Sequence, residues 1–151
     1  MTDGRGPGRD PGPGVQVRPA RRAEIPAVLD LWREADAVPS VSDDPASLGH
    51  LLDTSEDALL VAEAGGRLVG TIVAGWDGWR GHLYRLAVLP TERRRGIALR
   101  LVTEAERRLT AKGAVRISAL VMSEHHPAVA LWHAAGYTHD PRVVRYVRSL
   151  R

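Results

Sequence analysis

The order of apolar and polar residues predicts a chain of mixed strands and helices. Alternating or continuous apolar runs predict strands at residues 15–18, 58–63, 68–74, 82–89 and 115–121, with a last strand within 142–148. Apolar residues at helical spacing predict helices at residues 23–37, 45–52, 97–112 and 126–135. The branched residues of segment 115–121 favour a central place in the sheet.

Glycines mark where the predicted elements connect. Gly65 and Gly66 stand between two apolar strands and are typical of a tight hairpin. Residues 75–81 form a second glycine-rich turn, and Gly113 ends the helix that begins near residue 97. Residues 1–14 are rich in glycine and proline and are expected to be a disordered leader, which leaves residues 15–151 as one domain.

The segment from Leu86 to Ala98 is the most informative part of the chain. It runs from an apolar strand through Pro90 and three arginines to Gly96, where a helix begins. The free amides of a first helical turn and the positive end of the helix dipole attract anions. Flanking guanidinium groups suit phosphate. The segment therefore predicts a pyrophosphate site, although it has neither the Walker pattern nor the dinucleotide fingerprint.

Two motifs resemble those of the GCN5-related N-acetyltransferase (GNAT) family. The first is the pattern Arg93-x-x-Gly96-x-Ala98 after a strand, which is similar to the acetyl-CoA loop of that family. The second lies at residues 125–137, where four positions match a later motif at the family's spacing: Ala128, Leu131, Gly136 and Tyr137. The resemblance covers residues 15–148 and implies an α/β fold with a mixed, bent central sheet and helices on both faces.

The resemblance implies a binding site for acetyl-CoA as co-substrate. The expected cofactor-binding residues are Leu86, Ala87 and Val88 for the pantetheine arm, Arg93, Arg94, Arg95, Gly96, Ile97 and Ala98 for the pyrophosphate, and His125 and Trp132 from the later motif. Arg100 is expected to be a solvated helix residue or to reach the nucleotide end. No metal is expected, because the histidines lack metal-ligand spacing.

Two residues depart from the family pattern. His125 stands where the family usually has an asparagine, and Trp132 where it often has a tyrosine that protonates the departing thiolate. An indole N–H donates a hydrogen bond but cannot give up its proton near neutral pH. Trp132 is therefore expected to pack on the pantetheine or to bond to the sulfur, or else to be a core aromatic residue.

The proton acceptor for the substrate amine is expected on the predicted strand 82–89 or at the start of the predicted helix 126–135. Tyr84 is the first candidate, acting through ordered water; His82, Glu124 and Ser123 are the others. Each residue has a structural alternative. His82 is then a turn residue, Tyr84 an aromatic residue that packs on the sheet, and Glu124 or Ser123 a helix cap. The absence of cysteine fits direct attack of the amine on the thioester, because an acyl-cysteine intermediate has no residue to form on.

Charge is divided along the chain, whose net charge is +3. Residues 30–63 are mainly acidic and residues 85–116 mainly basic, a layout that argues against a nucleic-acid partner. A cationic small-molecule or peptide amine is therefore expected as acceptor, met by Asp36, Asp43 and Asp44 and by the aromatic faces of Trp76 and Trp79. The alternative for these aspartates is a solvated helical face with capping residues.

These features lead to one expected function and one alternative. The expected function is N-acetyl transfer from acetyl-CoA to a primary amine in a ternary complex. The alternative is a non-catalytic acyl-CoA sensor or interaction module on the same fold. No apolar run reaches the ~18 residues of a membrane span. A cytoplasmic location is expected and fits the absence of cysteine. A homodimer is common among similar proteins.

Overall fold

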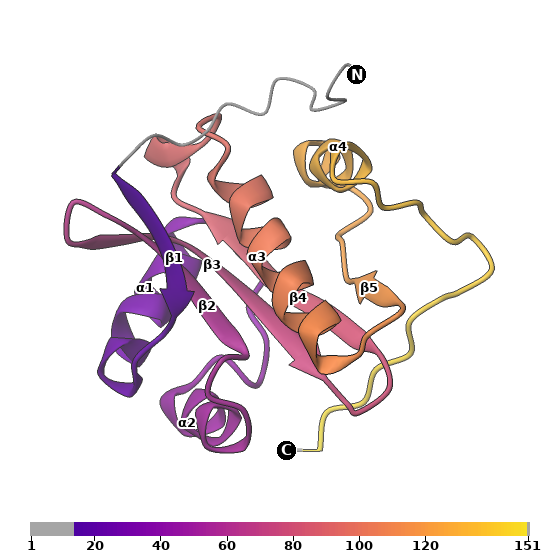
Figure 1. Cartoon of the computed structure of the whole chain (residues 1–151), viewed down its shortest axis with the longest axis horizontal. Helices are drawn as coiled ribbons and strands as arrows, with labels where there is room; N and C mark the ends of the chain where they lie inside the picture. The colour runs from indigo at the N-terminus through magenta and orange to yellow at the C-terminus, as the bar shows by residue number, and fades with distance from the viewer. Residues whose placement is uncertain (1–13, 151) are drawn as a thin grey trace.

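The computed structural model describes residues 14–150 and contains one sheet of five strands flanked by helices (Figure 1). The strands are β1 (Val15–Pro19), β2 (Leu59–Ala64), β3 (Arg67–Trp76), β4 (Gly81–Val88) and β5 (Ile117–Ala119). The helices are α1 (Ile25–Glu34), α2 (Pro45–Thr54), α3 (Ile97–Lys112) and α4 (His126–Ala134), with short 3-10 turns at Arg22–Glu24 and Pro90–Glu92. The expected leader lies, apart from Gly14, outside the described residues.

The sheet is mixed, as predicted. Its strand order is β1-β2-β3-β4-β5; the first four strands are antiparallel neighbours, and β5 runs parallel to β4. Gly65 and Gly66 both have positive φ, 58° and 75°, which is the conformation that a tight hairpin between β2 and β3 requires. The hairpin predicted from the two glycines is therefore confirmed.

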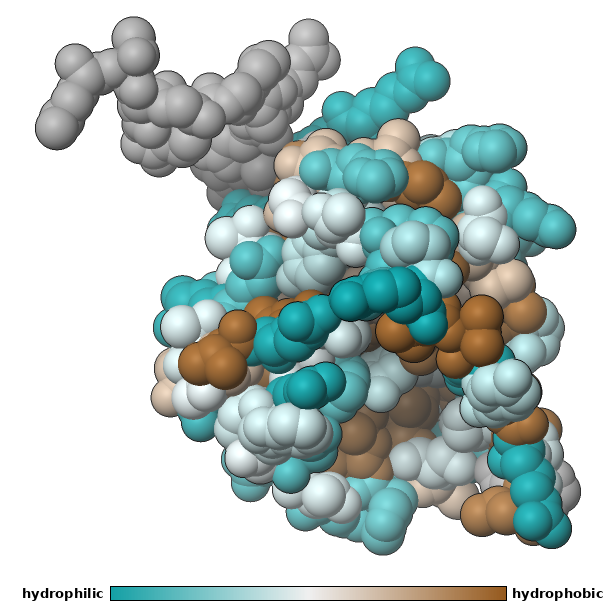
Figure 2. Space-filling view, turned by 90° about the vertical axis from the view of Figure 1, so that its right-hand side faces the viewer, coloured by the Kyte–Doolittle hydropathy of each residue, from teal (hydrophilic) through white to brown (hydrophobic). Residues whose placement is uncertain are grey.

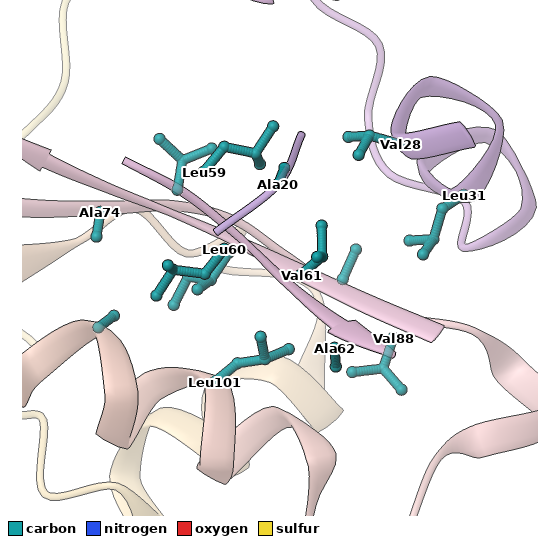
Figure 3. Packing of buried hydrophobic residues seen from close by; sticks show 14 of the residues in the cluster. Ala20, Val28, Leu31, Leu59, Leu60, Val61, Ala62, Ala74, Val88 and Leu101 are labelled. Atoms are coloured by element: carbon teal, nitrogen blue, oxygen red, sulfur yellow. The ribbon is translucent and has the colours of Figure 1, made fainter. Parts of the chain in front are cut away.

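Helices cover both faces of the sheet. Val28 and Leu31 of α1 point at the strands from one side, and Leu101 of α3 points at them from the other (Figure 3). The buried residues of α3 are Ile97, Leu101, Val102, Ala105 and Leu109, which recur at the helical spacing from which this helix was predicted. Burial of apolar side chains against both faces is the main source of stability in such a layered fold.

The prediction for the end of the chain was wrong. Residues 142–148 form no strand; Val143 and Val144 are 68% and 71% exposed, and Val143 N bonds locally to Asp140 O, 3.3 Å away. Alternating apolar residues fit a pleated surface, but they do not specify a partner strand. The segment 115–121 was also placed wrongly, since β5 has only three residues and lies at the edge of the sheet, paired with β4 alone in the described part of the chain.

The first helix is shorter than predicted. The pattern predicted residues 23–37, but α1 ends at Glu34, and Asp36 has a φ of 56° in the turn that follows.

Among residues 14–150, none of the helices combines the length and the apolar character that crossing a bilayer would require.

Candidate functional site

The strands β4 and β5 pair over only part of their length. Three residue pairs join them, the last being Leu83 with Ala119, and Leu120 N then donates to Leu83 O at 3.2 Å. Beyond this point β4 continues to Val88, whereas the chain after β5 turns toward α4. The main chain of β4 from Tyr84 to Val88 therefore has no strand beside it on this edge, within the residues described.

A bulge interrupts β4 where the two strands part. Tyr84 pairs with Val73 of β3, and Ala87 pairs with Thr71. Two residues of β4, Arg85 and Leu86, thus face a single residue of β3. Such a bulge redirects peptide groups and side chains locally and often lies beside an active site.

The loop after β4 ends in a helix start suited to an anion. Arg94 and Gly96 have positive φ, 64° and 75°, and Gly96 is the N-cap of α3. The first hydrogen bond of the helix runs from Arg100 N to Gly96 O, at 3.1 Å. The amides of Ile97 and Ala98 lie before it and have no helical acceptor, which makes this turn an anion-binding position.

The three arginines of the loop have different surroundings. Arg93 is exposed, and its guanidinium bonds to two main-chain carbonyls: its Nε donates to Val88 O at 3.3 Å and its Nη2 to Ala35 O at 3.4 Å. Arg95 pairs with Glu92. Arg94 is exposed and pairs with no carboxylate among residues 14–150. Arg93 thus fastens the loop to β4 and α1, while Arg94 has its charge available at the surface.

The start of α4 contains three further predicted site residues. The Nδ1 atom of His125 accepts a hydrogen bond from Ala128 N at 3.1 Å, so the imidazole caps the helix. The other nitrogen then carries the ring proton and is the one that a ligand could meet. Ser123 and Glu124 lie in the exposed turn before the helix.

Trp132 lies in the hydrophobic core with only 6% of its surface exposed. Its ring meets Tyr137 edge-on, with centroids 4.9 Å apart. Burial raises the pKa of Tyr137, and the Glu106 carboxyl to which it is hydrogen-bonded raises it further. This burial agrees with the alternative role expected for Trp132, that of a core aromatic residue. The raised pKa makes Tyr137 a weaker acid than a free tyrosine.

The side of the molecule that carries β5 and α4 is hollowed. Figure 2 looks onto this side and shows hydrophobic residues at the bottom of a recess with hydrophilic residues around it. Ligand sites are typically concave and apolar, with few polar groups to orient the ligand. The shape of this surface is therefore compatible with an elongated ligand lying beside the parted strands.

His82 and Tyr84 occupy alternate positions of β4, with ring centroids 6.2 Å apart. The Nε2 atom of His82 lies 3.1 Å from Oδ2 of Asp77, in the turn between β3 and β4. The other oxygen of Asp77 accepts bonds from Trp79 N and Arg80 N. The amide of Arg80, followed by His82, lowers the pKa of Asp77 to about 2. This carboxylate, which the sequence reasoning missed, is thus held ionised beside the imidazole.

The predicted acidic acceptor site is wrong for two of its three residues. Both carboxylate oxygens of Asp43 lie 2.6 Å from Nη2 of Arg85. Asp44 caps α2 by accepting from Ser47 N at 2.7 Å. Asp44 is thus a capping residue, as the alternative had it, whereas Asp43 forms an ion pair that the sequence did not predict. Of the three aspartates, Asp36 is the exposed one.

The aromatic residues of the same predicted site differ in exposure. Trp79 is 67% exposed, and the guanidinium of Arg80 lies 4.0 Å from its ring centroid. Trp76 is half-buried at the end of β3. No group of three or more histidine and carboxylate side chains within residues 14–150 is arranged to hold a metal ion.

Comparison with known proteins identifies this architecture. Residues 25–137 match the model of the acetyltransferase (GNAT) family. The chain belongs to the GNAT family. An acetyltransferase of Pectobacterium atrosepticum is 32% identical over 123 residues, which are 82% of this chain and 87% of that protein. The protein is thus an acetyltransferase of the GNAT family, and the prediction made from its two motifs is confirmed.

Solved GNAT structures share the fold at low sequence identity. Ard1 from Thermoplasma volcanium matches with a TM-score of 0.74 at 16% identity, covering 83% of each chain. The aminoglycoside acetyltransferase AAC(6')-Iy, in complex with the bisubstrate analogue CoA-S-monomethyl-acetylneamine, matches with a TM-score of 0.71 at 22% identity, covering 89% of this chain and 98% of that one. These likenesses confirm the predicted α/β GNAT fold.

Proposed function

We propose that this GNAT protein transfers the acetyl group of acetyl-CoA to a primary amine by direct attack in a ternary complex. The observation that carries the proposal is the continuity of three features along 15 residues: the parted edge of β4, its bulge, and the anion-binding start of α3. An extended pantetheine arm pairs with the main chain from Leu86 to Val88, and the pyrophosphate lies against the amides of Gly96, Ile97 and Ala98.

The bulge of β4 supplies the group that activates the thioester. Main-chain amides without a strand partner are fixed hydrogen-bond donors, and donors held in place before the reaction stabilise negative charge that develops on a carbonyl oxygen. The amine nitrogen attacks the carbonyl carbon, the carbon–sulfur bond breaks, and CoA leaves as a thiolate. Solvent can protonate that thiolate, since thiols ionise near pH ~8.5 and a general acid contributes only about 10²–10⁴-fold.

The amine proton leaves by way of Tyr84 and His82. Tyr84 is 36% exposed beside the bulge and orders a water near the amine, and His82 lies next to it on the strand. An imidazole accepts a proton near neutral pH much better than a phenol does. Asp77 holds Nε2 of His82, which leaves Nδ1 as the acceptor, in the way that a carboxylate orients an imidazole in hydrolases. Ser123 and Glu124 are the reserve candidates.

The acceptor is proposed to be a small-molecule or peptide amine with further positive charge. Among proteins of similar fold is an aminoglycoside acetyltransferase from a soil metagenomic sample in complex with sisomicin, with a TM-score of 0.68 at 20% identity. In this chain, Asp36 is an exposed group suited to a cation, and the exposed ring of Trp79 already carries one, the guanidinium of Arg80 at 4.0 Å from its centroid. The proposed acceptor site lies between the turn after α1 and the turn between β3 and β4.

Calorimetry and a thiol-release assay test this proposal. Acetyl-CoA binding is measured first, and CoA release is then followed with a thiol reagent across a panel of polyamines, aminoglycosides, amino acids and peptides. The protein contains no cysteine, so it contributes no background to the assay. Amine-dependent release supports acetyl transfer. Binding without release for every amine supports the sensor, and absence of binding contradicts both functions.

Two variants separate the proton route from the rest of the site. His82→Asn and Tyr84→Phe should lower kcat/KM for the amine at pH 7, and the loss with His82→Asn should shrink at higher pH, where more of the amine is already deprotonated. His50→Asn, at an exposed position of α2, is the matched control. A pH profile unchanged in both site variants would exclude these residues as the proton route.

A further inference from the structure

Arg85 has a main-chain conformation that an arginine rarely adopts. Its φ is 51°, in the left-handed region, although it lies within β4 and has a large side chain. Non-glycine residues remain in this region only where several contacts hold them, and such positions gather at functional sites. The contacts that hold Arg85 come from two directions.

The first set of contacts holds the carbonyl of Arg85 from inside the protein. The hydroxyl of Thr71, on β3, donates to Arg85 O at 2.9 Å. The same hydroxyl accepts from Nε1 of Trp32, on α1, also at 2.9 Å. Thr71 is fully buried and Trp32 is 4% exposed, so water does not compete for these bonds. A buried chain of hydrogen bonds therefore joins α1 to the bulge through β3.

The second set of contacts holds the side chain of Arg85 against the connection between α1 and α2. Its Nη2 atom lies 2.6 Å from both oxygens of Asp43, and its Nη1 donates to Val38 O at 2.8 Å. Its guanidinium also lies 5.0 Å from the ring centroid of Trp32. The side chains of Arg85 and Asp43 are each only 20% exposed. One guanidinium thus ties segment 36–44 to the strand at its bulge.

We infer that Arg85 is a positioning residue that, through Asp43 and Val38, couples segment 36–44 on the acceptor side to the β4 bulge that activates the thioester. The inference rests on the proposed acetyl transfer and deepens it. Arg85 does not need to touch either substrate. It fixes the peptide group that meets the carbonyl oxygen, and with the same side chain it fixes the wall against which the amine lies. The distance between the two reacting groups is then set by one residue.

This role predicts a particular kinetic pattern. Loss of the pair lets segment 36–44 and the bulge move apart, and misplacement by about 1 Å lowers transfer rates by about 100-fold. The pyrophosphate site lies on a different segment and is not held by Arg85, so acetyl-CoA affinity should change less than about threefold, a small effect on the scale of binding constants. A residue that only supported the overall fold would affect both quantities together.

The test uses the full chain with Arg85→Gln, Arg85→Lys, Asp43→Asn and the double variant Arg85→Gln/Asp43→Asn. Arg85→Gln and Asp43→Asn should each lower kcat for the best amine 10- to 100-fold, and the double variant should be no worse than the poorer of the two, because both remove one interaction. Arg85→Lys should keep only part of the rate, since one ammonium cannot reproduce the planar guanidinium that bonds to Asp43 through Nη2 and to Val38 O through Nη1. Arg33→Gln is the control, because Arg33 and Asp30 form an ion pair with both side chains more than 60% exposed.

Hydrogen exchange supplies a readout that does not depend on activity. In Arg85→Gln and in Asp43→Asn, the amides of residues 36–44 and those of residues 84–87 should exchange faster together, while those of α3 keep their protection. Faster exchange in only one of the two segments contradicts the coupling, and so does wild-type kcat in both single variants. A parallel loss of acetyl-CoA affinity also contradicts it. If the wild-type protein transfers no acetyl group, the proposed function fails, whereas the coupling is still decided by exchange.

Discussion

Replacement of Thr71 by valine removes the hydroxyl at the centre of the buried chain that holds the β4 bulge. Valine keeps the branched shape of threonine and fills nearly the same space. The hydroxyl makes two hydrogen bonds, with Trp32 Nε1 and Arg85 O, both at 2.9 Å. Thr71 itself has no exposed surface, so water cannot take the place of the hydroxyl without rearrangement. The substitution therefore isolates the energetic effect of one buried polar group.

The magnitude follows from these contacts. Two neutral hydrogen bonds contribute about 1 kcal/mol each, and a buried polar group left without its partner costs about 1–3 kcal/mol. We expect Thr71→Val to lower the free energy of unfolding by about 2–4 kcal/mol in total. In a chain of this size each kcal/mol corresponds to about 2–4 °C, so the melting temperature should fall by roughly 5–15 °C.

Urea unfolding followed by circular dichroism measures the effect. Thr103→Val is the matched control, because the Thr103 hydroxyl donates to Leu99 O at 2.8 Å but is exposed on α3. The control should change stability by less than about 0.5 kcal/mol. In the double variant Trp32→Phe/Thr71→Val the two losses should not add, since the first change also removes the donor. Equal stability of the Thr71 and Thr103 variants would refute the reasoning.

Three further outcomes can be measured. Gly96→Ala places a side chain at a φ of 75°, so we expect the free energy of unfolding to fall by about 1–2 kcal/mol. Acetyl-CoA binding, measured by calorimetry, should also weaken. Unchanged binding would contradict the role of this turn. Gly81→Ala puts a methyl group 2.8 Å from Leu109, and an unfolding free energy lower by about 1–3 kcal/mol is expected; an unchanged midpoint in urea would show that α3 yields easily. The hydrogen bonds of Arg18 hold the pKa of Glu24 at about 2 instead of 4.5, so this pair stabilises the protein above pH 4.5 and less as the pH falls toward 2. The acid limb of stability against pH should therefore flatten in Glu24→Gln, and an identical limb would count against the pair.

The sequence predicted those elements whose conformation is set by residues close together along the chain. The stripe of α3 and the glycines of the β2–β3 hairpin are such cases, because helical spacing and positive φ are set by neighbouring residues. The start of α3 was predictable for the same reason. The last strand was not, since pairing with a distant edge decides whether an apolar segment becomes a strand.

In the candidate site, too, features set by neighbouring residues were predictable, whereas contacts between distant residues were not. The loop at residues 93–96 lies where its motif predicted, but Arg93 turned out to bond to Val88 O and Ala35 O. The ion pair of Arg85 with Asp43 joins residues 42 positions apart, and nothing in the sequence around either residue indicates it. Asp77 was missed although it is only five residues from His82, because the turn between β3 and β4 brings the two side chains together.

Beyond Leu83, the outer edge of β4 has no paired strand among residues 14–150, and it presents backbone amides and carbonyls that are there whatever side chain a residue carries. Under the proposed function, a cofactor bound through these main-chain groups would tolerate exchange of the neighbouring side chains. Selectivity for the amine can then be redesigned at Asp36 and Trp79, which belong neither to the proposed proton route nor to the anion-binding turn, and this makes the fold a practical starting point for engineering new acylation substrates.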